Sequence, residues 1–296
     1  MDFGLTMFVT GGLATGLLCS LAVGLVVGFF SGLLGIGGGA LLVPVFKLGF
    51  AMEAIVSTAT SLFTIIPTSI SGFVTHLRRG TCIPKVGIAA GLAGAATSSL
   101  GVWLASHSPD WMIMMVAAVV IGYSAYTMLR KGFRMPKVAN RKEARESANR
   151  KEAASKETSA SVDQIPPAPQ VTGKMLAQAV AIGLITGVVS GYVGVGGGFI
   201  MVPLFMSVLG TPMKLTSGTS LIAVMILAIP GVVYQGLLGN VDWLAGVAVA
   251  AGSIPGALLG ARLIPYAPER TLRILFGCFL LIAAALLLVN QLAPMA

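Results

Sequence analysis

Two glycine clusters have the residue type and spacing to form a binding site. Gly35-Ile-Gly-Gly-Gly39 lies within residues 31–46, and Gly194-Val-Gly-Gly-Gly198 lies within residues 190–205. Both stand between long apolar runs, where each glycine destabilises a helix by about 1 kcal/mol relative to alanine, so the sequence predicts a break in each helix. Inside a bilayer, the unpaired peptide groups of such a break are tolerated only against protein or a water-filled cavity.

Backbone N–H groups at these breaks suit an anion, because they present positive dipole ends without a fixed charge. Close helix packing is the alternative role. Packing motifs, however, space their glycines along one helical face, whereas adjacent glycines face every direction. We therefore expect substrate contacts from the glycines of both breaks: Gly35, Gly37, Gly38, Gly39, Gly194, Gly196, Gly197 and Gly198.

Polar side chains near the breaks are the next candidates for substrate contacts. The pairs Thr60-Ser61 and Thr219-Ser220 occupy equivalent positions. Their hydroxyls could donate to an oxyanion, or they could bond to carbonyls of their own helix, as hydroxyls in membrane helices often do. Both roles stay open.

Four more side chains are candidate substrate contacts: His76, Gln235, Tyr192 and Tyr234. For His76 we favour an interfacial side chain beside the basic loop over a proton-coupling group. For each tyrosine, orienting the substrate and bonding to a neighbouring carbonyl are equally compatible with the sequence.

The centres of the apolar spans carry no Asp, Glu, Lys or Arg. Proton-driven pumps usually display carboxylates there. A HExxH motif, a P-loop and a pair of catalytic aspartates are also missing, which argues against a zinc enzyme, an ATPase and an intramembrane protease. We expect neither an enzyme nor any metal or cofactor site.

Composition identifies a membrane protein. Of the 296 residues 56% are hydrophobic and 10% are charged, whereas a soluble domain has roughly a quarter charged residues. The apolar runs have the length of helical spans and lack barrel alternation. The net charge of +9 comes from basic residues beside the spans, so it does not indicate nucleic-acid binding. Cys19, Cys82 and Cys278 fit no metal or redox spacing and are expected to be buried free thiols.

The chain is a duplication. Residues about 10–130 repeat without a gap at an offset of 159: Pro44 pairs with Pro203, and Gly80 pairs with Gly239. Two homologous halves joined by a linker follow from this match. We divide the chain into an N-terminal transmembrane repeat (1–130), a charged linker (131–171) and a C-terminal transmembrane repeat (172–296). The linker is expected to hold a solvated helix over 137–156 and a stiff segment over 159–170.

Basic residues predict that the two repeats are inverted. An inverted arrangement places every Lys and Arg except Lys47 on one side of the membrane, and a parallel one would move Lys214, Arg262, Arg270 and Arg273 to the other. Basic loops prefer the cytoplasm, so we expect inversion and a cytoplasmic linker. Inversion needs an odd number of crossings in each half. The expected fold is therefore an all-α polytopic membrane protein whose halves each have four long spans and a short broken or re-entrant helix at the glycine motif, over 40–50 and 199–208.

The duplicated Gly-x-Gly-Gly-Gly motif, followed by Val-Pro and then by a Thr-Ser pair, resembles the sulfite exporter TauE/SafE family, also called the toluene sulfonate uptake permease family. The resemblance covers both apolar halves and excludes the linker. It implies transport of sulfur-containing anions such as sulfite, sulfonates or sulfoacetate across the bacterial inner membrane.

The first functional hypothesis is a secondary transporter that exports such anions. An anion leaving a negative cell interior gains about 2.3 kcal/mol per charge per 100 mV, so no coupling ion is needed. The alternatives are an anion channel of the same fold and a membrane scaffold or assembly factor that uses the charged linker. The expected partners are a small sulfur-containing anion and the lipid bilayer; a homo-oligomer is compatible with the sequence, and nucleic acid is not expected.

Overall fold

A computed structural model describes residues 12–134 and 171–292 of the chain. All regular structure in these two ranges is helical. The expected solvated helix over 137–156 and the stiff segment over 159–170 lie outside the described residues, as does the rest of the linker between 135 and 170.

Each half of the chain contributes four long helices and one short helical arm. The first half has α2 (Gly12–Leu34), the short α3 (Gly39–Pro44) continued by the turn η1 (Val45–Gly49), and then α4 (Ala54–Arg78), α5 (Pro84–Ser106) and α6 (Asp110–Arg134). The second half has α8 (Gly173–Val193), the short α9 (Gly198–Val208), α10 (Met213–Leu237), α11 (Trp243–Leu263), the turn η2 (Ile264–Tyr266) and α12 (Glu269–Leu292). The all-α polytopic fold is confirmed.

Seven described helices are long and apolar enough to cross a membrane by length and composition: α2, α4, α5, α6, α8, α10 and α11. The predicted eighth span corresponds to α12, which has 24 residues but carries Glu269, Arg270 and Arg273 at its start. The arm α9 has 11 residues. At 1.5 Å per residue it reaches about 16 Å, roughly half the hydrocarbon thickness.

Local sequence explains where several helices begin. Pro84 opens α5, where its missing N–H costs nothing and its fixed φ favours the helix. Asp242 precedes α11, and its Oδ1 accepts a 3.0 Å hydrogen bond from the amide of Ala245. Such a cap pairs one of the free N–H groups of the first turn.

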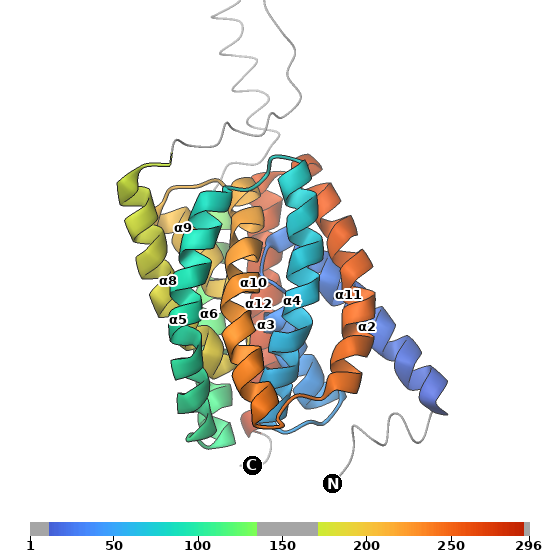
Figure 1. Ribbon diagram of the computed structural model, residues 1–296. Helices are drawn as coiled ribbons and strands as arrows, with labels where there is room; N and C mark the ends of the chain where they lie inside the picture. The colour runs from blue at the N-terminus through green and yellow to red at the C-terminus, as the bar shows by residue number, and fades with distance from the viewer. Residues whose placement is uncertain (1–11, 135–170, 293–296) are drawn as a thin grey trace, which may run out of the picture.

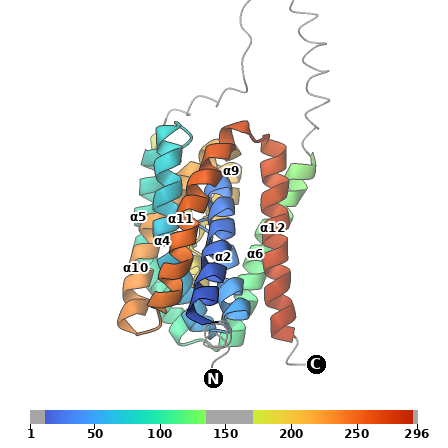
Figure 2. The same ribbon diagram turned by 90° about the vertical axis from the view of Figure 1, so that its right-hand side faces the viewer.

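Helices from the two halves are interleaved. The equivalent helices α4 and α10 lie together in the middle of the bundle (Figure 1). On one side α5 packs against α8, and on the other α2 packs against α11. The last equivalent pair, α6 and α12, packs together beyond them (Figure 2). Neither half therefore forms a separate core.

Glycines allow α2 to lie directly on α11. A Cβ atom added to Gly24 would lie 2.2 Å from the carbonyl oxygen of Val249, and one added to Gly32 would lie 2.1 Å from that of Ala257. The equivalent pair α5–α8 has the same feature, since a Cβ on Gly183 would lie 2.2 Å from the carbonyl of Ala90. Glycines spaced by four or eight residues along these helices thus have a packing role.

The equivalent helices α4 and α10 run in opposite directions. Gly72 on α4 faces Leu221 of α10, while Gly231 further along α10 faces Leu62 nearer the start of α4. The end of α6 and the start of α8 lie at the end of the bundle opposite to the start of α2 (Figures 1 and 2). These directions support the inverted repeat, which stays our interpretation.

The basic loops of the two halves meet at one end of the bundle. Arg79, after α4, donates a 2.9 Å hydrogen bond from Nη1 to the carbonyl oxygen of Arg262, near the end of α11. We call this end the basic end, and it is also where α6 ends and α8 begins (Figure 1).

The cysteine prediction was wrong for Cys19 and Cys278. All three thiols are free, but Cys19 on α2 and Cys278 on α12 are exposed, whereas Cys82 is buried.

Candidate functional site

Both glycine motifs interrupt the helical path. The helix α2 ends at Leu34 and α3 begins at Gly39; α8 ends at Val193 and α9 begins at Gly198. The φ angles are +75°, +73° and +85° at Gly35, Gly37 and Gly38, and +72°, +74° and +70° at their equivalents in the second half, Gly194, Gly196 and Gly197. Left-handed φ angles strain residues with a Cβ atom, which explains why glycine occupies these positions.

The two interruptions, which we call the first and second glycine breaks, lie against each other. A Cβ atom on Gly39 would lie 2.1 Å from the carbonyl oxygen of Val195, and one on Gly198 would lie 2.6 Å from the carbonyl oxygen of Ile36. Each glycine thus lets the backbone of one half touch the backbone of the other. The breaks, which are far apart in the sequence, therefore come together at one place in the fold.

Ile65 of α4 and Val224 of α10 flank this meeting point. A Cβ on Gly37 would lie 2.7 Å from Val224 Cγ1 and 3.2 Å from Ile65 Cγ2. A Cβ on Gly196 would meet the same two side chains, at 3.3 Å and 2.6 Å. Both side chains are fully buried, and they occupy equivalent positions. This apolar pair, which our sequence-based prediction missed, borders both breaks.

The predicted Ser hydroxyls bind the break of the opposite half. Ser220 donates a 2.7 Å hydrogen bond from Oγ to the carbonyl oxygen of Gly35, and Ser61 donates from Oγ to the carbonyl oxygen of Gly194. Each Ser also lies 2.9 Å from a carbonyl of its own helix. Their hydrogen atoms are therefore directed at protein carbonyls that the end of a helix leaves unpaired.

The predicted Thr hydroxyls hold loops of the opposite half. Thr219 Oγ1 accepts a 2.8 Å hydrogen bond from the amide of Ile83, and Thr60 Oγ1 accepts a 3.0 Å hydrogen bond from the amide of Asp242. Thr219 also donates to the carbonyl of Leu215 on its own helix, at 2.7 Å. The structure thus gives the Thr-Ser pairs a role in joining the halves, in addition to the bonds within their own helices that we had considered.

Unpartnered hydrogen-bond donors surround the breaks. Within residues 12–134 and 171–292, the amides of Gly37, Gly38, Gly196 and Gly197 donate to no protein acceptor. The same is true of three fully buried side-chain hydroxyls, those of Ser31, Ser69 and Ser190.

These serines are placed directly beside the glycines. Ser69 Oγ lies 3.4 Å from the position of a Cβ on Gly37, and Ser190 Cβ lies 3.2 Å from that of a Cβ on Gly197. Leaving a buried polar group unpaired costs about 1–3 kcal/mol, so an unpaired set at one place suggests a ligand or water there. Sequence reasoning did not assign Ser31 and Ser190 to the site, although a signal was present: they are equivalent residues and open the two repeated segments.

His76 is fully buried, so the interfacial position that we favoured for it is wrong. Its Nε2 lies 2.9 Å from the carbonyl oxygen of Gly32 and must carry a hydrogen, because a carbonyl only accepts. Its Nδ1 lies 2.8 Å from Thr81 Oγ1. The ring therefore holds the end of α4 to α2 just before the first break.

The other three candidate side chains, those of Gln235, Tyr192 and Tyr234, differ in burial and in hydrogen bonding. Gln235, the equivalent of His76, is buried, and its Oε1 accepts a 2.7 Å hydrogen bond from Asn240 Nδ2. Tyr192 packs in the apolar cluster that includes Val195 and Phe199. Tyr234 is half-buried near the end of α10. Contact of these residues with a substrate stays a prediction.

Comparison with known proteins agrees with this architecture. Residues 20–287 match the family described as sulfite exporter TauE/SafE. The chain is 27% identical over 247 residues to the probable membrane transporter protein YdhB of Bacillus subtilis, covering 83% of this chain and 89% of the relative. It is 24% identical over 274 residues to the probable membrane transporter protein YunE of the same organism, covering 88% and 95%.

A third relative, a probable membrane transporter protein of Xylella fastidiosa, is 23% identical over 249 residues, with 83% of this chain and 84% of the relative covered. No solved structure gives a significant match. The family match extends over both halves, including both glycine breaks. The chain belongs to the sulfite exporter TauE/SafE family of membrane transporters.

Proposed function

We propose that this protein is a secondary transporter that exports small sulfur-containing oxyanions, such as sulfite or a small sulfonate, across the bacterial inner membrane. The substrate binds between the two glycine breaks. The observation that carries the proposal is the set of unpartnered donors there: four glycine amides and the hydroxyls of Ser31, Ser69 and Ser190.

A site made of neutral donors suits an oxyanion that must leave again. Hydrogen bonds to a charged acceptor are roughly twice as strong as those between neutral groups, so several N–H and O–H donors can replace part of the hydration shell. A fixed Lys or Arg would hold the anion more strongly and slow its release. Ile65 and Val224, which border both breaks, are apolar and offer the anion no polar contact.

The membrane potential supplies a direction. Export of a monovalent anion from a negative interior gains about 2.3 kcal/mol per 100 mV, and a divalent anion gains twice that. In this proposal the linker and the basic end face the cytoplasm, as basic loops prefer. Substrate entering from the basic end is then driven toward the opposite end without a coupling ion.

The test is flux in proteoliposomes of known orientation at a controlled voltage. Sulfite, methanesulfonate and sulfoacetate are compared with chloride, with a neutral sugar and with potassium. We expect saturable, voltage-driven flux of at least one sulfur oxyanion and no flux of the sugar or of potassium. Flux restricted to neutral solutes or cations contradicts the proposal, and conductance that never saturates replaces the transporter by a channel of the same fold.

A further inference from the structure

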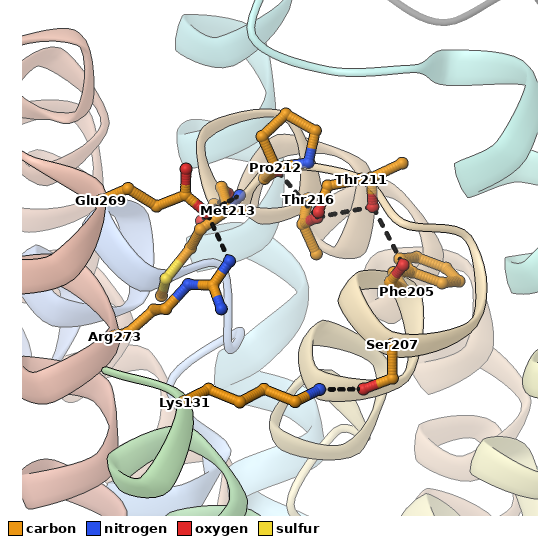
Figure 3. Close-up of polar contacts among 10 residues, drawn as sticks. Lys131, Phe205, Ser207, Thr211, Pro212, Met213, Thr216, Glu269 and Arg273 are labelled. Carbon is orange, nitrogen blue, oxygen red and sulfur yellow. Dashed lines mark hydrogen bonds and ion pairs between the residues drawn. The ribbon is translucent and has the colours of Figure 1, made fainter. Parts of the chain in front are cut away.

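A cluster of cations lies between α6, α9 and α12 at the basic end. Figure 3 shows Lys131 pointing toward Ser207 and Arg273 pointing toward Glu269, next to Met213. Lys131 donates from Nζ to Ser207 Oγ on α9. Arg273 Nη2 donates a 2.6 Å hydrogen bond to Glu269 Oε1, and the same oxygen accepts one of 3.3 Å from the amide of Met213. These contacts therefore join residues of four helices: α6, α9, α10 and α12.

Positive charge exceeds negative charge in this cluster. Among the described residues that make these contacts or adjoin them on α12, Lys131, Arg270 and Arg273 supply three cations, and Glu269 supplies one carboxylate. The helices α6 and α12 approach closely here, since a Cβ on Gly132 would lie 3.3 Å from Arg273 Cβ. Lys131 and Arg273 consequently repel each other. Crowded cations of this kind require a counter-charge.

Two guanidinium groups in the cluster also have unused donors. In the described part of the chain, the Nε atoms of Arg270 and Arg273 are buried and have no hydrogen-bond partner. The two residues lie three positions apart on α12 and so share a face of the helix. Guanidinium donors bind phosphate-type oxyanions with particular strength. The surplus charge and the unpaired N–H groups point to the same missing group, an anion with several oxygens.

The surroundings of the cluster indicate where this anion comes from. The residues next to it include Met206, Met213 and Leu272, which belong to the buried apolar core. Toward the outside, α6 exposes Phe133, and Tyr266 is exposed before α12. Exposed aromatic side chains near basic residues mark the level of lipid headgroups. Basic sites between helices at the cytoplasmic side are suited to phosphate headgroups.

We propose that Lys131, Arg270 and Arg273 form a binding site for the phosphate of an anionic membrane lipid. The first half has no equivalent of this arginine pair. The positions equivalent to Arg270 and Arg273 in the first half are Trp111 and Met114, at the opposite end. Bound lipid would join α6, α9 and α12 at the basic end. This inference is independent of which anion is transported.

The experiment measures lipid binding to the purified full-length protein in detergent. Native mass spectrometry counts bound lipid, and the unfolding midpoint is followed with dioleoyl phosphatidylglycerol, dioleoyl phosphatidylcholine or inorganic phosphate. We expect phosphatidylglycerol to bind more tightly than phosphatidylcholine and to raise the midpoint. Each cation near a headgroup contributes about fivefold in affinity, so Arg270→Gln with Arg273→Gln should weaken phosphatidylglycerol binding by about 25-fold. Lys85→Gln, an exposed cation at the same end, is the matched control and should change it less than about twofold.

The outcomes separate the sources of the anion. Equal binding of the two lipids, or an equal loss in Lys85→Gln, overturns the site. If inorganic phosphate raises the midpoint and phosphatidylglycerol does not, the occupant is a free oxyanion and the lipid proposal is wrong. Should the double Gln variant fail to fold, Arg270→Lys with Arg273→Lys decides, because it keeps both charges and removes both Nε donors. Native affinity in that variant would mean a merely charged surface.

Discussion

At the glycine breaks, each half of the chain supplies what the other lacks. Ser61 of the first half donates to the carbonyl of Gly194, and Ser220 of the second half donates to the carbonyl of Gly35. At the two ends of the bundle, in contrast, residues at equivalent positions of the two halves differ. Glu269 and Asp110 are equivalent: Glu269 accepts from the amide of Met213, which opens α10, at 3.3 Å, and Asp110 accepts from the amide of Ala54, which opens α4, at 3.2 Å. The neighbouring positions, however, carry arginines at one end and Trp111 and Met114 at the other.

The centre and the ends of the bundle therefore have different roles in our proposal. A site to which both halves contribute equivalent glycines and serines looks similar from either side of the membrane, as alternating access by inverted repeats requires. The ends do not bind substrate in our proposal, so their residues are free to differ and to set the orientation in the membrane. We infer that the centre determines what is transported and that the basic end determines how the protein sits in the membrane.

The largest expected effect is the sidedness of two equivalent loops. Gly80 and Gly239 both have positive φ and open space around them. In a variant without native cysteines, Gly80→Cys and Gly239→Cys should react with a membrane-impermeant maleimide from opposite sides, because equivalent loops of inverted repeats face opposite compartments. Labelling is measured in intact cells and in inverted vesicles. The same sidedness for both positions would refute the inversion.

Blocking either break should abolish transport. In Gly38→Val or Gly197→Val the new side chain meets a φ of +85° or +70°, which strains the backbone by about 1–3 kcal/mol. It also faces Val27 or Thr186, at 3.2 Å or 2.6 Å from its Cβ. Flux should fall to background in both variants while membrane insertion persists. The controls Gly80→Val and Gly239→Val carry similar strain in open loops and should keep their flux. Native flux in either break variant would show that its half does not contribute to the site.

The apolar pair between the breaks should control which anions pass. Replacing Ile65 by Ala removes volume beside both breaks and should raise the flux of a bulky sulfonate relative to sulfite by several-fold. Val224→Ala should act in the same direction. Losing a buried Ile side chain costs about 2–5 kcal/mol of unfolding free energy, so Ile121→Ala, fully buried on α6, controls for stability. A similar change in selectivity in Ile121→Ala would contradict a specific role for the pair.

Helix positions and glycine packing were accessible from the sequence, whereas the partners of polar side chains were not. The breaks follow from local physics, because three neighbouring glycines oppose helix wherever they stand. The bond from Ser220 to Gly35 joins residues 185 positions apart and depends on how α10 meets the end of α2. The burial of His76 and the exposure of Cys19 and Cys278 depend likewise on which helix neighbours which. A single sequence gives the period of a helix and not its neighbours.

Serines that bind the protein should behave differently from serines that are unpartnered. Ser61→Ala and Ser220→Ala leave the carbonyls of Gly194 and Gly35 without these donors, and should lower the unfolding free energy by about 1–3 kcal/mol. Ser31→Ala removes a buried hydroxyl that has no protein partner, so stability should hold or rise slightly while the KM for sulfite increases by several-fold. Thermal unfolding and concentration-dependent flux separate the two effects. An unchanged KM in Ser31→Ala would remove this hydroxyl from the site.

The smallest expected effect concerns the thiol of Cys82, in the loop between α4 and α5. Burial raises the pKa of Cys82 to about 11, because it disfavours the thiolate. Since the thiolate is the reactive form, alkylation at pH 8 should be slow in the folded protein and should speed up as the pH approaches 11. The raised pKa also makes stability depend on pH. Its contribution to the unfolding free energy is fully present below the ordinary thiol pKa of about 9 and is lost as the pH rises through about 11.

The rate is measured with a small maleimide at a series of pH values, in a variant whose only cysteine is Cys82. Val241 is the equivalent residue and is also buried, so Val241→Cys in a cysteine-free background is the matched probe of the other loop. Similarly slow maleimide reactions at both positions would show that these two loops resemble each other, as the two glycine breaks do. A fast reaction of Cys82 at pH 8 would show that the loop at the basic end opens in solution, because a buried thiol that stays in place cannot react at that rate.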